Sequence, residues 1–142
     1  MIARRVLALM LLASPTWAQQ RVSDIGRADP DRRALMDALR PMFERETFGP
    51  VEFAVRELRR SGVFAYGVVQ PQRPGGAPIR WQDTNFRDQL NPHDWYGGRT
   101  YVLWRRQAEG WKVAEFAVNP TDVVWIEWER QHRLPRRLFS TE

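Results

Sequence analysis

The alternation of hydrophobic and polar residues near the middle of the chain predicts a β-hairpin over Val51–Val69. Every second residue from Val51 to Val55 is apolar, which is the period of a strand with one exposed face. A charged stretch ending at Gly62 breaks this pattern, and the apolar run Val63–Val69 follows it. Two such runs joined by a short polar turn with glycine are typical of a hairpin.

Leu58 is out of phase with the alternation that ends at Val55. An extra residue in one strand shifts the phase of all the residues that follow it. We therefore expect a β-bulge, or an early end of the strand, near Glu57.

A second hairpin is predicted from Thr100 onward. The strand Thr100–Arg106 is followed by a turn at Ala108–Gly110 and by a partner strand over Trp111–Val118. Continuous alternation along this partner strand would place Glu115 on the same face as Trp111.

The residues before the first hairpin predict an amphipathic helix. Asp29 can cap its first turn, and Pro30 suits the first helical position. The apolar residues recur with helical spacing at Ala34, Leu35, Ala38 and Leu39. Pro41 lacks an amide hydrogen, so we expect the helix to stop or kink there.

The stretch after the second hairpin predicts a short C-terminal helix that ends before Pro135. Thr121 can serve as its N-cap. The residues that share one helical face are Val124, Trp125, Trp128 and His132. A strand is the alternative, because Val124, Ile126 and Trp128 also alternate. We expect Leu138–Phe139 to dock the tail.

A long connection, Pro71–Arg99, separates the two hairpins. It contains many turn-forming residues and four aromatic residues. Loops of this length inside a compact domain are uncommon and are usually functional, disordered or structured in part. Because aromatic residues favour burial, we expect the segment to fold against the domain, with a short strand around Ile79 and Trp81.

These elements predict an α+β domain: an N-terminal helix on a four-stranded antiparallel sheet, a long loop insertion and a short C-terminal helix. We expect the helix on one sheet face and the other face free. Over Asp29–Val118 the order of elements resembles the cystatin-like and NTF2-like arrangement. The stretches Val51–Gly67 and Trp111–Trp128 are similar to small uncharacterised exported bacterial proteins. Folds of this kind carry inhibitors, binding modules and enzymes alike, so the resemblance implies no single activity.

The first residues have the layout of a secretory signal peptide. Arg4 and Arg5 precede the apolar run Val6–Ala13, and small residues flank Trp17 before a cleavage site after Ala18. We expect residues 1–18 to be removed, 19–28 to form a flexible leader and 29–142 to form a single domain. The alternative is an uncleaved anchor. Export implies a periplasmic or secreted protein with no membrane span after cleavage.

Composition narrows the chemistry further. The chain has 142 residues and no cysteine, which excludes thiol catalysis, cysteine-bound metal and a lipidated cysteine. Its formal net charge is +5, and Lys112 is the only lysine. Almost every positively charged side chain is therefore an arginine, which can contact a carboxylate or phosphate in bidentate fashion. Export argues against nucleic acid as a partner and favours an envelope protein, a peptide or a glycan.

No residue pattern predicts a catalytic centre, a metal site or a cofactor. His93 could bind a metal only with nearby carboxylates such as Asp83, Asp88 or Asp94, and that spacing matches no known ligand motif. Ser61 and Ser140 lack the sequence of a nucleophile elbow. The carboxylates could act as a glycosidase pair only if the fold placed two of them across a cleft.

The aromatic residues of the long loop give the best candidate for a site. Aromatic faces beside planar polar groups suit sugar rings or peptides, and we predict a ligand-facing surface formed by Trp81, Asp83, Trp95 and Tyr96. The alternative is that these rings fill one end of the core. The sequence thus favours a non-catalytic binding domain. Its alternative is a small NTF2-like enzyme with an Asp or Glu acid-base residue in a pocket between sheet and helix.

Overall fold

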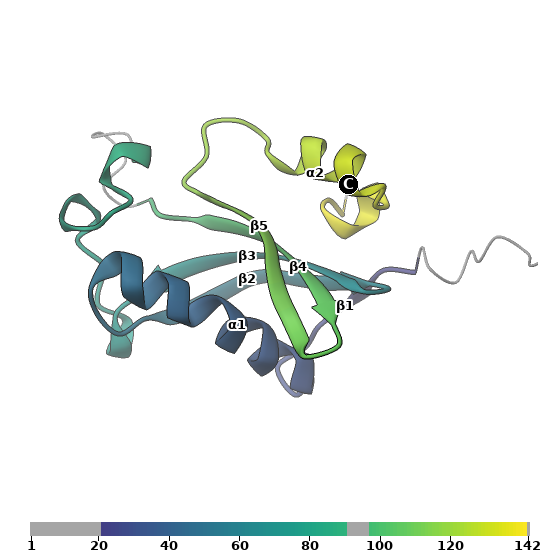
Figure 1. Cartoon of the computed structure of the whole chain (residues 1–142), viewed down its shortest axis with the longest axis horizontal. Helices are drawn as coiled ribbons and strands as arrows, with labels where there is room; N and C mark the ends of the chain where they lie inside the picture. The colour runs from purple at the N-terminus through teal and green to yellow at the C-terminus, as the bar shows by residue number, and fades with distance from the viewer. Residues whose placement is uncertain (1–20, 91–96, 142) are drawn as a thin grey trace, which may run out of the picture.

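The computed structural model describes residues 21–90 and 97–141 and shows an α+β domain built on one antiparallel sheet (Figure 1). Its strands lie in the order β1-β2-β3-β4-β5. Their bounds are β1 Ser23–Asp24, β2 Glu52–Ser61, β3 Phe64–Gln72, β4 Thr100–Gln107 and β5 Gly110–Val118. The two α-helices are α1, Pro30–Thr47, and α2, Trp125–His132. Figure 1 shows α1 on one face of the sheet and the C-terminal segment with α2 on the other.

Both predicted hairpins are present. Ser61 of β2 pairs with Phe64 of β3, so two residues form the first turn, and Gly62 there has a φ of 58°. This left-handed conformation favours glycine, which carries no Cβ. In the second hairpin Gln107 pairs with Gly110, and again two residues form the turn. Short local turns of this kind fix the register of both strand pairs.

The predicted bulge in β2 is confirmed. Val55 pairs with Val69 and Glu57 with Val68, so Arg56 is the additional residue in β2. The bulge returns Leu58 to the face that carries α1, where its side chain is buried. Arg56 is exposed at this point of the sheet.

A second bulge lies in β5 and changes the predicted faces of this strand. Leu103 pairs with Glu115 and Trp104 with Val113, which leaves Ala114 as the additional residue. Trp111 and Val113 pack on the α1 side, whereas Glu115 approaches His132 on the opposite side at 3.3 Å. The expectation that Glu115 shares a face with Trp111 is therefore wrong.

Helix α1 begins where its sequence predicts. The Asp29 carboxylate accepts a hydrogen bond from the backbone N–H of Asp31 at 3.0 Å, and Pro30 is the first helical residue. Leu35 and Leu39 are fully buried against the sheet. They share a core with Phe43 and Trp104, which are also fully buried.

The helix does not stop at Pro41, as the sequence suggested, but continues to Thr47. Pro41 lies on the exposed side of α1, whereas Phe43 and Thr47 beyond it are buried. A proline on the solvent side costs one backbone hydrogen bond. Burial of the last turn is the favourable contribution that offsets this cost. Phe48 then ends the helix in a left-handed conformation with a φ of 59°.

The sheet face opposite α1 is covered rather than free. The C-terminal segment packs a second core onto it from Trp128, Leu138 and Phe139, which contact Tyr66 and Leu103. This finding confirms a C-terminal helix and the docking of the tail.

The attachment of this segment is also polar. The guanidinium Nε of buried Arg59 donates to the carbonyl oxygen of Leu138 at 2.9 Å. Helix α2 starts at Trp125, and its N-cap position is Val124 rather than Thr121.

The segment expected to be a flexible leader contributes strand β1, which is additional to the four strands predicted from the sequence. Ser23 pairs with Arg60 and Asp24 with Arg59, and the side chain of Ile25 is buried. Strand β1 has only two residues, so it pairs with one end of β2.

The long connection between β3 and β4 folds against the domain, as predicted, over its described residues. Ile79, Trp81 and Phe86 are buried in the α1-side core. Instead of the short strand expected near Ile79, the chain forms a 3₁₀ turn at Trp81–Asp83. Over residues 21–90 and 97–141, neither helix is long and apolar enough to span a bilayer.

Candidate functional site

The structure places two of the four predicted site residues. Trp81 is 4% exposed and packs under Gly98, where a Cβ atom would lie 2.3 Å from the indole. Asp83 is exposed and pairs with Arg80 at 3.2 Å. Trp95 and Tyr96 lie outside the described residues. Trp81 is thus a core residue, and no ring face of this tryptophan is displayed to a ligand.

A pocket of about 540 Å³ nevertheless opens beside Trp81, and we call it the loop groove. It lies where the loop after β3 passes the end of the sheet. Its lining residues are Arg56, Gln70, Pro71, Gln72, Gly76, Pro78, Ile79, Arg80, Trp81, Gln82 and Gly97.

The walls of the loop groove are held by specific hydrogen bonds. The Gln70 side-chain amide donates to the carbonyl oxygen of Gly97 at 2.8 Å, which joins β3 to the segment before β4. Arg73 donates from Nη1 to the Thr47 hydroxyl and to the Pro50 carbonyl, each at 3.1 Å. These contacts fix the start of the loop to the C-terminal end of α1.

The far end of the groove wall has its own support. The Thr84 hydroxyl donates to the Trp81 carbonyl at 2.8 Å and accepts from the Phe86 backbone N–H at 3.1 Å. The Asn85 amide donates to Glu46 of α1 at 2.7 Å. A loop tied in this way presents its side chains from a fixed scaffold, as binding loops commonly do.

The floor and the rim of the loop groove differ in chemistry. Pro71, Ile79 and Trp81 form a buried apolar floor. At the rim, Gln72 and Gln82 form no side-chain hydrogen bond with any described residue. An apolar floor with a few uncommitted polar groups is the usual composition of a ligand site.

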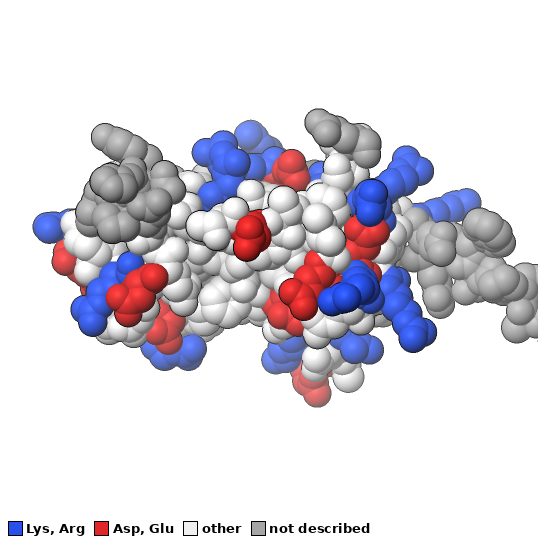
Figure 2. Space-filling model, turned by 90° about the horizontal axis from the view of Figure 1, so that it is seen from above, with Lys and Arg blue, Asp and Glu red and all other residues white. Residues whose placement is uncertain are grey.

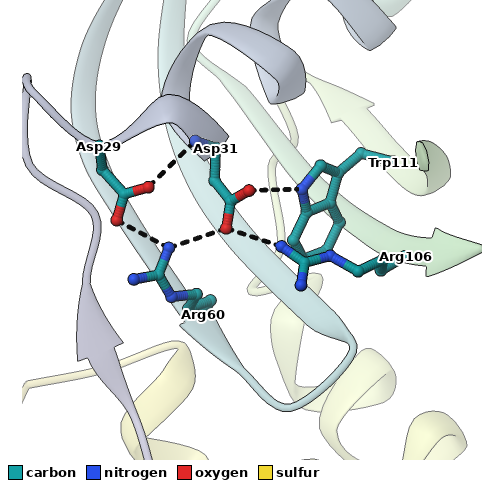
Figure 3. A network of polar contacts seen from close by, with 5 residues as sticks. All are labelled: Asp29, Asp31, Arg60, Arg106 and Trp111. Carbon is teal, nitrogen blue, oxygen red and sulfur yellow. Dashed lines mark hydrogen bonds and ion pairs between the residues drawn. The ribbon is translucent and has the colours of Figure 1, made fainter.

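A second pocket lies at the N-terminal end of α1, and four of its charged side chains, Asp29, Asp31, Arg60 and Arg106, pair with one another (Figure 3). Arg60 donates to Asp29 at 2.7 Å and to Asp31 at 2.8 Å, and Arg106 donates to Asp31 at 2.8 Å. The pKa of Asp29 lies below its ordinary value, chiefly because the Asp31 backbone N–H donates to the carboxylate and also because Arg60 does. This network joins the start of α1 to β2 and β4, whereas Arg21, which also lines the pocket, is exposed and forms no ion pair with a described residue.

The remaining candidates for chemistry do not assemble into a catalytic or metal site in the described part of the chain. Across residues 21–90 and 97–141, no three His, Cys, Asp or Glu side chains lie close enough together to hold a metal ion. His93 and Asp94 lie outside those residues. His132 contacts Glu115 and packs on the ring of Phe64, with 5.5 Å between ring centres.

Charge on the face seen from above is mixed. Figure 2 shows Lys and Arg side chains interspersed with Asp and Glu, and a middle region that is mostly uncharged. A polyanion contacting this face would therefore meet local positive groups rather than a continuous basic stripe.

Sequence reasoning identified the loop but not the strand residues that face the groove. Arg56, Gln70 and Gln72 come from β2 and β3, and their part in the site depends on where the loop folds back. The phase change at Glu57 was the one available signal, because a bulge often redirects a side chain toward a site. Comparison of the chain with protein-family models, with curated proteins and with solved structures finds no match.

Proposed function

We propose that this protein is a non-catalytic binding domain, exported to the periplasm or secreted, that holds its ligand in the loop groove. The observation that carries the proposal is the rim of the groove, where Gln72 and Gln82 have side-chain amides without a partner among the described residues. These solvent-accessible amides hydrogen-bond to water in the free protein, so a ligand exchanges those bonds for its own, and the amides act mainly to fix its orientation.

Two further features support this function. Arg73 and Asn85 tie the loop to α1, and the Gln70–Gly97 hydrogen bond ties its end to the sheet, so little order has to be gained on binding. The N-terminal residues have the layout of a signal peptide, which agrees with an extracytoplasmic partner such as an envelope protein, a peptide or a glycan.

The alternative of an NTF2-like enzyme receives no support from the site. The space between α1 and the sheet is filled by fully buried side chains, among them Leu39, Phe43 and Trp104.

The experiment selects ligands from libraries that contain acidic, neutral and basic members, so that the charge of the ligand is not assumed. The protein lacking residues 1–18 is immobilised and screened against random displayed heptapeptides and against a glycan array. Bound ligands are then measured on two variants. Gln72→Trp fills the groove. Gln107→Trp places the same ring at the exposed C-terminal end of β4, away from the groove.

We expect the selected ligands to lose at least tenfold in affinity for Gln72→Trp and to bind Gln107→Trp as they bind the parent protein. Equal melting temperatures of the two variants exclude unfolding as the cause. Ligands that bind both variants equally well would show that the loop groove is not the site.

A further inference from the structure

Among its described lining residues the loop groove carries two cationic side chains, Arg56 and Arg80, and no aspartate or glutamate. Arg80 pairs with Asp83, but both side chains are largely exposed, so water screens the pair. Arg56 has no ion pair with any described residue. A ligand that places a carboxylate in this groove would supply the missing negative charge.

The position of Arg56 in β2 makes its orientation a property of the fold. Arg56 is the additional residue of the bulge between Val55 and Glu57. In a regular strand its neighbours would alternate across the sheet, but the bulge inserts it between two residues that both pair with β3. The charge is therefore placed at the groove by the backbone of the sheet rather than by a loop.

The other groups of the groove distinguish a peptide from a sugar. Sugars are commonly held against an exposed aromatic face, and the one aromatic side chain among the described lining residues, Trp81, is 4% exposed. Pro71 and Ile79 are as deeply buried as Trp81, so the apolar surface open to a ligand is the exposed ring of Pro78, which suits an aliphatic side chain. The amides of Gln72 and Gln82 each offer a donor and an acceptor, which matches the N–H and C=O groups of a peptide backbone.

We propose that the loop groove binds an acidic peptide in an extended conformation. Its backbone hydrogen-bonds to Gln72 and Gln82, an aliphatic side chain packs on Pro78, and a carboxylate contacts Arg56. This inference rests on the proposed function, and it names the ligand class for the same site. A charge-assisted hydrogen bond to a guanidinium is about twice as strong as a neutral one, so Arg56 carries the preference for acidic ligands.

The test measures binding of one defined probe by fluorescence anisotropy. The probe is a fluorescein-labelled octapeptide of alternating glutamate and valine, and its control replaces every glutamate by glutamine. An oligogalacturonate of similar charge is added as a competitor. The protein variants are Arg56→Gln and Arg137→Gln, which remove the same charge at the groove and at an exposed position near the C-terminus.

We expect saturable binding of the glutamate probe, binding at least tenfold weaker for the glutamine control, and a loss of about tenfold for Arg56→Gln. Arg137→Gln should change the affinity less than twofold. No saturable binding, equal binding of both probes, or equal losses for the two variants would overturn the proposal. Displacement of the probe by oligogalacturonate at lower concentration than by unlabelled peptide would assign the groove to an acidic glycan instead.

The two proposals fail in different ways. The selection from mixed libraries could yield neutral or basic ligands whose binding is lost in the Gln72→Trp variant. In that case the groove remains the binding site, and only the proposal of an acidic ligand is wrong. If no selected ligand responds to Gln72→Trp, the groove is not the site and both proposals fall.

Discussion

The indole Nε1 of Trp111 donates a hydrogen bond to Oδ1 of Asp31 at 3.3 Å and so joins strand β5 to the first turn of α1. The other carboxylate oxygen of Asp31 accepts from Arg60 and Arg106, each at 2.8 Å (Figure 3). Arg106 also lies over the Trp111 ring, 4.5 Å from its centre. One aspartate thus connects both hairpins to the helix that covers them.

We therefore expect Asp31→Asn to lower the free energy of unfolding by roughly 1–3 kcal/mol, because hydrogen bonds to a charged group are lost in a partly buried site. Asp37→Asn is the matched control, since Asp37 is 53% exposed and pairs with Arg40 on the helix surface. Its effect should stay within about 0.5 kcal/mol. Urea unfolding of both variants measures the difference, and equal losses would contradict a special role for Asp31.

The cap residue Asp29 predicts a pH dependence of stability. Its pKa in the folded protein is lowered, so its contribution is complete above the pKa of the unfolded chain, about 3.9 for Asp, and is lost as the pH falls through the folded value. Asp29→Asn keeps a cap residue but removes the titration. We expect the urea midpoint to fall less between pH 5 and pH 2 in this variant than in the parent. An identical fall in both proteins would argue against this assignment.

The aromatic residues of the long loop separate into two predicted roles. Trp81 is in the core, so Trp81→Ala should cost roughly 3–5 kcal/mol of unfolding free energy. If Trp95 and Tyr96 face a ligand, as the sequence predicts, replacing both by Ala should lower the free energy of unfolding by less than about 1 kcal/mol. Urea unfolding of the double variant decides between the two roles. A loss of 3 kcal/mol or more would assign these rings to the core and remove them from the site.

The signal-peptide layout of the first residues predicts a defined N-terminus. The pattern of Arg4 and Arg5, the apolar run Val6–Ala13 and the small residues before Gln19 places cleavage after Ala18. The intact mass of the protein recovered from its producing cells should correspond to a chain that starts at Gln19. Ala18→Arg should block the cleavage, because signal peptidases require a small residue there. Recovery of the parent protein with Met1 still attached would contradict the prediction.

The parts of the fold that sequence predicted are those fixed by local patterns. The Asp29–Pro30 start of α1 depends on neighbouring residues alone, and both hairpins follow from a period of two around short turns. The phase change at Leu58 was strong enough to reveal the bulge because only one register buries that leucine.

The parts that were missed depend on distant contacts. Ala114 is small and neutral, so nothing in β5 shows which face changes there. Strand β1 is two residues long and has no period to detect. The predicted site residues lie in the loop that borders the groove, yet burial of Trp81 follows from the absence of a side chain at Gly98, which lies 17 residues further along the chain.

The brevity of β1 leaves the outer edge of β2 from Glu52 to Glu57 without a neighbouring strand in the described part of the chain. An unpaired edge is a template on which a second molecule can add a strand, and repeated addition leads to aggregation. Here the charges of Glu52, Arg56 and Glu57 and the bulge itself interrupt that template. The arginine that lines the loop groove therefore also interrupts this edge, and replacing Arg56 by an apolar residue would leave a longer uncharged template for strand addition.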